Sequence, residues 1–256
     1  MSISACAAIP LIVTAAQGFS KASVPMPPVL FVPGLLCTAA LFAPQIAALG
    51  SSVESRVADH TRHEDIQDLA ASVLAAAPAR FAVVGLSMGG YVAFELLRQA
   101  PERVAAAAFL DTSARPDTPE QTERRHAQIR IAAGGRLDRI ADLQFPLMFH
   151  ESRLGDAALE DTYRRMVEET GPDAFIRQQK TIMSRPDSRP DLGRIACPTL
   201  VLVGDGDRAT PPELSREIAA GIPGAELAIV ERCGHLSTLE RPADVSKRLW
   251  DWLNRI

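Results

Sequence analysis

Residues 81–91 read FAVVGLSMGGY, and this stretch decides the fold. Its first four residues form a continuous apolar run, which is typical of a parallel strand covered on both faces. Residues 91–100 have helical composition and end just before Pro101, where a helix has to stop. The stretch therefore predicts a strand that turns directly into a helix.

The turn carries the pattern G-x-S-x-G, with Ser87 at its centre. A strand-to-helix turn this sharp leaves no space for bulky side chains at the flanking positions, and Gly85, Gly89 and Gly90 meet that demand. The turn places the Ser87 hydroxyl at the N-terminus of the helix, where the helix dipole and the Met88 N–H face a developing oxyanion. Ser87 is therefore the candidate nucleophile.

Further apolar runs alternate with helical stretches along the chain. The predicted strands are residues 29–32, 105–110, 199–203 and 227–230, with a weaker one at 53–57. The predicted helices include residues 66–77, 212–220 and 243–253. This alternation predicts an α/β fold: a doubly wound, mostly parallel sheet of six strands with right-handed crossovers.

Residues 116–190 interrupt the alternation with a long, mostly helical segment. One crossover needs far fewer residues, so we interpret the segment as a helical cap inserted between two strands of a core formed by residues 26–115 and 191–256. Ordinary packing helices are the alternative. An apolar cluster in the cap supplies candidate substrate contacts, although packing within the cap would explain it equally well. The cluster comprises Leu143, Phe145, Leu147, Met148 and Phe149.

A serine hydroxyl needs a base to take its proton, and the base needs a carboxylate to orient it. His235 follows the last predicted strand, at the same sheet edge as Ser87, and is the candidate base. Asp207, just beyond the strand at 199–203, is the candidate acid because the order Ser, Asp, His suits this turn type. Asp111 and Asp205 also end strands and remain alternatives.

A second oxyanion donor is expected in the loop after the first strand. Pro33-Gly34-Leu35-Leu36 occupies that loop. Gly34 lets the backbone approach closely, so the Leu35 N–H is the candidate donor alongside Met88.

Taken together, these residues resemble the α/β-hydrolase superfamily from about residue 28 to the C-terminus. Gly85-Leu86-Ser87-Met88-Gly89-Gly90 resembles its nucleophile elbow, Gly204-Asp205-Gly206-Asp207 its acid loop, and Gly234-His235 its histidine loop. The resemblance implies Ser87, Asp207 and His235 as a catalytic triad. One departure is Pro33, where many members have a histidine whose side chain braces the oxyanion loop.

The predicted function is hydrolysis of a carboxylic ester of small or medium size through an acyl-enzyme, without a metal or cofactor. Lactone, thioester and carbon–carbon bond hydrolysis on the same triad are alternatives. From another class, the fold can serve as a non-catalytic ligand receptor. A serine at the turn argues against haloalkane dehalogenation, which needs an aspartate there.

The expected partner is a small-molecule ester or a related acyl substrate. The formal net charge of −4 and the absence of a basic stripe argue against nucleic acid. The apolar run at residues 5–16 is too short to span a membrane and lacks the preceding basic residues of a signal peptide. We therefore expect a cytoplasmic protein, with export as the alternative, and residues 1–25 as a dispensable extension.

The four cysteines form no metal-binding spacing, and we expect free thiols, with a Cys37–Cys233 bridge as the alternative. The sequence makes no prediction of oligomeric state.

Overall fold

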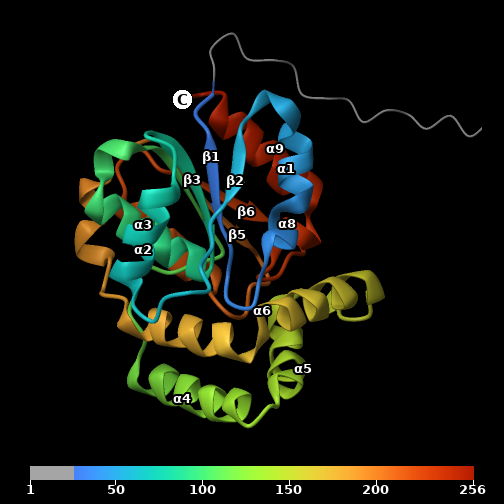
Figure 1. Ribbon diagram of the computed structural model, residues 1–256. Coiled ribbons are helices and arrows are strands. Elements are labelled where there is room, and N and C mark those ends of the chain that lie inside the picture. Colours follow the sequence, from blue (N-terminus) through green and yellow to red (C-terminus); the bar gives the residue numbers. More distant parts are fainter. Residues whose placement is uncertain (1–25) are drawn as a thin grey trace, which may run out of the picture.

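The computed structural model describes residues 26–256, which form a six-stranded parallel sheet with helices on both faces (Figure 1). The strands are β1 (Val29–Val32), β2 (Ser55–Val57), β3 (Phe81–Leu86), β4 (Val104–Leu110), β5 (Thr199–Gly204) and β6 (Glu226–Val230). Their order in the sheet is β2-β1-β3-β4-β5-β6. The strands β3, β4 and β5 are buried along their whole length, as their continuous apolar sequences require.

The helices of the core cover the sheet as two layers (Figure 1). One face is covered by α1 (Ala43–Leu49) and α9 (Pro242–Leu253), which pack on each other beside the short α8 (Ser237–Glu240). The other face is covered by α2 (Ile66–Ala76), α3 (Met88–Gln99) and α7 (Pro212–Gly221). Short 3₁₀ turns occupy several connections: Ala39–Phe42, Gly50–Ser52, Pro101–Arg103, Glu151–Arg153 and Arg189–Arg194.

Three helices between β4 and β5 lie over the carboxyl edge of the sheet (Figure 1). They are α4 (Pro119–Ala133), α5 (Leu137–Met148) and α6 (Ala157–Ser184). A capping box starts α4, in which Thr118 and Gln121 satisfy each other's backbone N–H groups. Gly171, with φ 70°, divides α6 into two helical stretches. We refer to these three helices as the cap helices.

The predicted fold class is confirmed. Most predicted strands and helices agree with the structure within one or two residues at each end, and two elements differ more. The helix after Ser87 begins at Met88 rather than at residue 91. Glycine has a low helix propensity, which hid this start in the sequence. Gly89 and Gly90 are nevertheless part of the helix, because the close packing there leaves no space for a side chain. The weaker strand is only three residues long. The expectations for residues 1–25 lie outside the described residues. Cys37 and Cys233 are both free, buried thiols, so the alternative bridge does not form.

Within residues 26–256, no helix combines the length and apolar character needed to cross a membrane.

The start of α3 packs too closely against its neighbours to leave space for side chains at Gly85 and Gly89. A Cβ on Gly89 would lie 1.9 Å from the carbonyl oxygen of Val32, and a Cβ on Gly85 would lie 2.3 Å from the carbonyl oxygen of Gly89. These neighbours are backbone atoms of β1 and α3, which cannot move aside without shifting the whole element. The absence of side chains therefore sets how closely α3 approaches the sheet.

We predict that Gly89→Ala destabilises the protein although alanine is the better helix former. Alanine gains about 1 kcal/mol of helix propensity. A Cβ–oxygen separation of 1.9 Å forces a backbone shift, and overpacking of this kind costs about 1–3 kcal/mol, or more where backbone must move. Calorimetric melting should show a lower Tm than wild type.

Gly193→Ala is the matched control, because a Cβ there meets nothing within 4 Å. A Gly89→Ala protein that melts at or above the wild-type temperature would contradict the packing argument.

Candidate active site

Ser87 occupies a strained turn between β3 and α3. Its backbone has φ 56° and ψ −115°, a conformation that costs a non-glycine residue about 1–3 kcal/mol. Three hydrogen bonds hold it there: Ser87 N–H donates to Leu110 O at 2.9 Å, and Ser87 O accepts from Gly90 N–H at 2.9 Å and from the Thr112 hydroxyl at 2.7 Å. The turn directs the Ser87 side chain away from the sheet edge.

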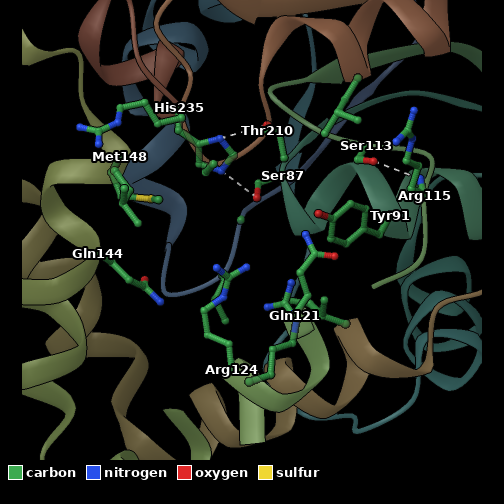
Figure 2. Close-up of a pocket in the computed structure, with 18 of the residues that line it drawn as sticks. Ser87, Tyr91, Ser113, Arg115, Gln121, Arg124, Gln144, Met148, Thr210 and His235 are labelled. Atoms are coloured by element: carbon green, nitrogen blue, oxygen red, sulfur yellow. Dashed lines mark hydrogen bonds between the residues drawn. The ribbon is translucent and has the colours of Figure 1, made fainter. Parts of the chain in front are cut away.

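The structure brings Ser87, His235 and Asp207 together in one hydrogen-bonded chain (Figure 2 shows the contact between Ser87 and His235). The Ser87 Oγ lies 2.9 Å from His235 Nε2, and His235 Nδ1 lies 2.8 Å from Asp207 Oδ2. Because a carboxylate faces Nδ1, that nitrogen carries the proton, and Nε2 is free to accept from the serine hydroxyl. The three side chains come from loops after β3, β5 and β6.

Asp207 is held by its own loop. Its Oδ1 accepts from the backbone N–H groups of Ala209 and Thr210, both at 2.9 Å, and its Oδ2 accepts from the Thr210 hydroxyl at 2.7 Å. The Thr210 hydroxyl also lies 3.2 Å from His235 Nδ1. Sequence reasoning missed Thr210, although an aspartate followed three residues later by threonine is a pattern for such a local turn.

The two alternative acids have other partners. Asp111 is fully buried, where its Oδ1 accepts from Gly204 N–H at 3.0 Å and its Oδ2 contacts the Ser237 hydroxyl. Asp205 Oδ1 accepts from Cys233 N–H at 3.1 Å and joins the β5 and β6 loops. Among residues 26–256, His235 has a carboxylate hydrogen bond to Asp207 alone.

Burial and charge act in opposite directions on His235. Burial by itself lowers the pKa of this imidazole, but the charge and the hydrogen bond of Asp207 raise it, and the net pKa lies above the ordinary value. Burial, followed by the neighbouring charge of Asp207, raises the pKa of Asp111 well above its ordinary value, which favours the neutral acid. Asp207 therefore favours the protonated form of the His235 imidazole, whereas the buried Asp111 favours its own uncharged form.

The two candidate oxyanion donors, Leu35 and Met88, lie near Ser87. Met88 is the first residue of α3, where backbone N–H groups lack partners within the helix. The Leu35 N–H makes no hydrogen bond within the described part of the chain, and its loop lies close enough that a Cβ on Gly34 would be 3.4 Å from Ser87 Cβ. Both residues are therefore placed beside the serine.

The loop that contains Leu35 is braced by side chains that sequence reasoning missed. Gln178 on α6 accepts from Leu36 N–H at 3.1 Å, and its amide nitrogen lies 3.0 Å from His60 Nε2. His60 Nε2 lies 3.0 Å from Gly34 O. Both side chains are buried, and burial lowers the pKa of His60, which favours its neutral form. Many members of the resembled superfamily brace this loop with a histidine at the position of Pro33. In this chain, Gln178 and His60 brace the loop instead.

A cavity of about 330 Å³ lies between the cap helices and Ser87 (Figure 2). Of the apolar cluster expected to contact substrate, only Leu147 and Met148 line this cavity. Phe145 and Phe149 pack instead against Tyr163 in the core, with ring centroids 5.9 and 6.2 Å from the Tyr163 ring. The spacing of apolar residues along a helix does not distinguish those that line the cavity from those that pack inside the cap.

Groups of three or more His, Cys, Asp or Glu side chains suited to a metal ion do not occur in the described residues.

Comparison with known proteins agrees with this geometry. Residues 19–248 match the alpha/beta hydrolase family. The chain belongs to that family. A putative non-heme bromoperoxidase from Mycobacterium tuberculosis is 32% identical over 205 residues, covering 78% of this chain and 74% of the relative.

Two solved structures of the same family superpose closely on this chain. A thermophilic esterase from Thermogutta terrifontis, with malate bound, has a TM-score of 0.82 and 28% identity, over 93% of this chain and 91% of the esterase. An enol-lactonase from Burkholderia xenovorans has a TM-score of 0.81 and 26% identity, over 89% of this chain and 91% of the lactonase.

The hydrogen bonds around the three aspartates predict different outcomes for their asparagine variants. Asp207→Asn removes the negative charge and favours the wrong imidazole tautomer, a change that costs serine proteases roughly 10⁴-fold in kcat. Asp111→Asn preserves the shape of an uncharged acid, and Asp205→Asn changes a loop contact, so both should stay within about tenfold of wild type. Steady-state kinetics on folded variants measure this. Severe loss in Asp111→Asn beside an active Asp207→Asn would move the acid to β4.

Proposed function

We propose that this α/β hydrolase cleaves a carboxylic ester through an acyl-enzyme, with Ser87, His235 and Asp207 as its catalytic triad. The observation that carries the proposal is the unbroken chain of hydrogen bonds from Ser87 Oγ through His235 to Asp207. In an inactive receptor there is no reason for a strained serine, a correctly oriented imidazole and a fixed carboxylate to coincide.

The proposed reaction has two halves. His235 Nε2 takes the proton from Ser87 Oγ as the oxygen attacks the carbonyl carbon, and then gives that proton to the departing alcohol, which leaves an ester on Ser87. His235 next takes a proton from water, whose oxygen attacks the acyl-enzyme. The carboxylic acid departs, and the proton returns to Ser87. The Asp207 carboxyl group, hydrogen-bonded to His235 Nδ1, orients and stabilises the imidazolium in both halves.

The oxyanion formed in each half would be stabilised by the Leu35 and Met88 N–H groups. In other serine hydrolases, one such donor is worth about 10²–10³ in kcat. The free Leu35 N–H and the braced loop support this assignment, because a donor contributes most when it is held in place before the charge develops.

The esterase and enol-lactonase neighbours support acyl transfer to water as the reaction class. Lactones, thioesters and carbon–carbon bonds adjacent to a carbonyl are related substrates for the same triad. The cavity volume suits a small molecule, and the negative net charge argues against nucleic acid.

Ser87→Ala is expected to reduce ester turnover on the order of 10⁴-fold or more, because the nucleophile and its base work as a unit. Hydrolysis of p-nitrophenyl esters measures the loss, and circular dichroism checks the fold. Ser113→Ala is the matched control, since this hydroxyl lines the same cavity but accepts from Arg115 N–H rather than contacting His235. Near-wild-type turnover in Ser87→Ala would exclude the proposed nucleophile.

The pH dependence should follow His235, which must be neutral to act as a base. Because its pKa is raised, kcat/KM should increase with pH through a midpoint above about 6.5, the value for a free imidazole. Asp207→Asn removes the charge that raises this pKa while burial still lowers it, so the midpoint of the residual activity should move to lower pH. A midpoint that stays fixed in this variant would show that Asp207 does not set the ionisation of His235.

A further inference from the structure

The wall of the cavity that contains Ser87 is strongly basic. Five arginines line it, and no aspartate or glutamate of the described chain does. Three glutamines add amide groups to the same wall. The arginines are Arg115, Arg124, Arg125, Arg185 and Arg208, and the glutamines are Gln121, Gln128 and Gln144. Since the whole chain carries a net charge of −4, this concentration of positive charge is a property of the cavity and not of the composition.

Acidic residues behind the wall compensate only part of this charge. Arg115 pairs with Glu217 at 2.9 Å. Arg125 and Arg185 share a single carboxylate, that of Asp117, at 2.5 and 2.8 Å. Two carboxylates therefore serve three of the five arginines, and Asp117 holds the Arg125 and Arg185 side chains in place.

The other two arginines have no acidic partner in the described part of the chain. Within residues 26–256, neither the Arg124 nor the Arg208 side chain forms an ion pair or a hydrogen bond, and both residues are exposed. Arg208 follows Asp207 directly in the chain. These two guanidinium groups leave an uncompensated positive charge at the wall of the cavity.

Arg124 is placed opposite the nucleophile. Gln121, Arg124 and Gln128 are spaced by three and four residues along α4, so they project from one face of that helix. All three line the cavity. Figure 2 shows the Arg124 side chain extending from the cap toward Ser87, with Gln121 beside it and Gln144 on the other side. A guanidinium and several amides thus face the serine across the cavity.

We propose that the substrate is an ester with a free carboxylate, which Arg124 binds while Ser87 attacks the ester carbonyl at the other end. This inference rests on the proposed ester hydrolysis. A planar guanidinium binds a carboxylate through two parallel hydrogen bonds, which gives both attraction and orientation. The excess positive charge also raises the local concentration of an anionic substrate at the cavity. A purely apolar acyl group would leave the Arg124 and Arg208 guanidinium groups without an anionic partner among the groups that line the cavity.

A pair of matched esters tests the proposal. The p-nitrophenyl half-ester of adipic acid carries the carboxylate, and methyl p-nitrophenyl adipate has the same chain without the charge. With the uncatalysed rates subtracted, wild type should have a kcat/KM at least about tenfold higher for the charged ester. This preference should diminish as salt screens the charge.

Arg124→Gln should reduce the ratio of the two kcat/KM values about 10- to 100-fold, mainly through KM of the charged ester. Arg130→Gln is the matched control, because Arg130 is an exposed arginine on the same helix that does not line the cavity. It should keep the wild-type ratio.

A wild-type enzyme that hydrolyses both esters equally well, or an Arg124→Gln variant that keeps the preference, overturns the inference and leaves ester hydrolysis standing. Failure to hydrolyse either ester contradicts the proposed function instead. In that case, titration calorimetry on the Ser87→Ala variant still tests whether the cavity prefers a carboxylate, because it measures binding without turnover. Adipic acid monoamide should bind more tightly than its methyl ester, and equal binding of the two overturns the proposal.

Discussion

The approach of α3 to the sheet at Gly85 and Gly89 is the constraint on which the site depends. At these two positions a Cβ would overlap backbone atoms, so the chain can turn from strand to helix within one residue only because side chains are absent. That residue is Ser87, whose positive φ is held by hydrogen bonds to β4 and to the Thr112 hydroxyl. Local strain of about 1–3 kcal/mol is small beside the packing that sustains it.

The carboxyl edge of the sheet also positions Asp207 and His235. Asp207 and His235 follow adjacent parallel strands, so their loops are neighbours, and Asp205 and Asp111 fix those loops by accepting backbone N–H groups. The loop after β1, which we propose supplies an oxyanion donor, is supported by His60 and by Gln178, which belongs to a cap helix. The cap therefore has two contacts with the proposed chemistry: Gln178 supports the oxyanion loop, and Arg124 faces the nucleophile.

The sequence predicted the features that depend on local pattern. Continuous apolar runs located the strands, and small residues around Ser87 located the turn, because both follow from backbone geometry. Side-chain partners between distant elements could not be predicted in this way. Gln178 reaches Leu36 over 142 residues of sequence, and nothing nearby marks it. Phe145 and Leu147 belong to one helix, yet only Leu147 lines the cavity, because the packing of the cap decides which side faces inward.

The proposed mechanism requires that Ser87 is a nucleophile and that His235 activates it. Incubation with diethyl p-nitrophenyl phosphate, followed by intact mass and peptide mapping, tests this without knowledge of the substrate. We expect one diethylphosphoryl group per chain, located on Ser87, with esterase activity lost in proportion to labelling. Labelling should be much slower in His235→Ala. Loss of activity with Ser87 unmodified, or full labelling that leaves esterase activity intact, would contradict the account.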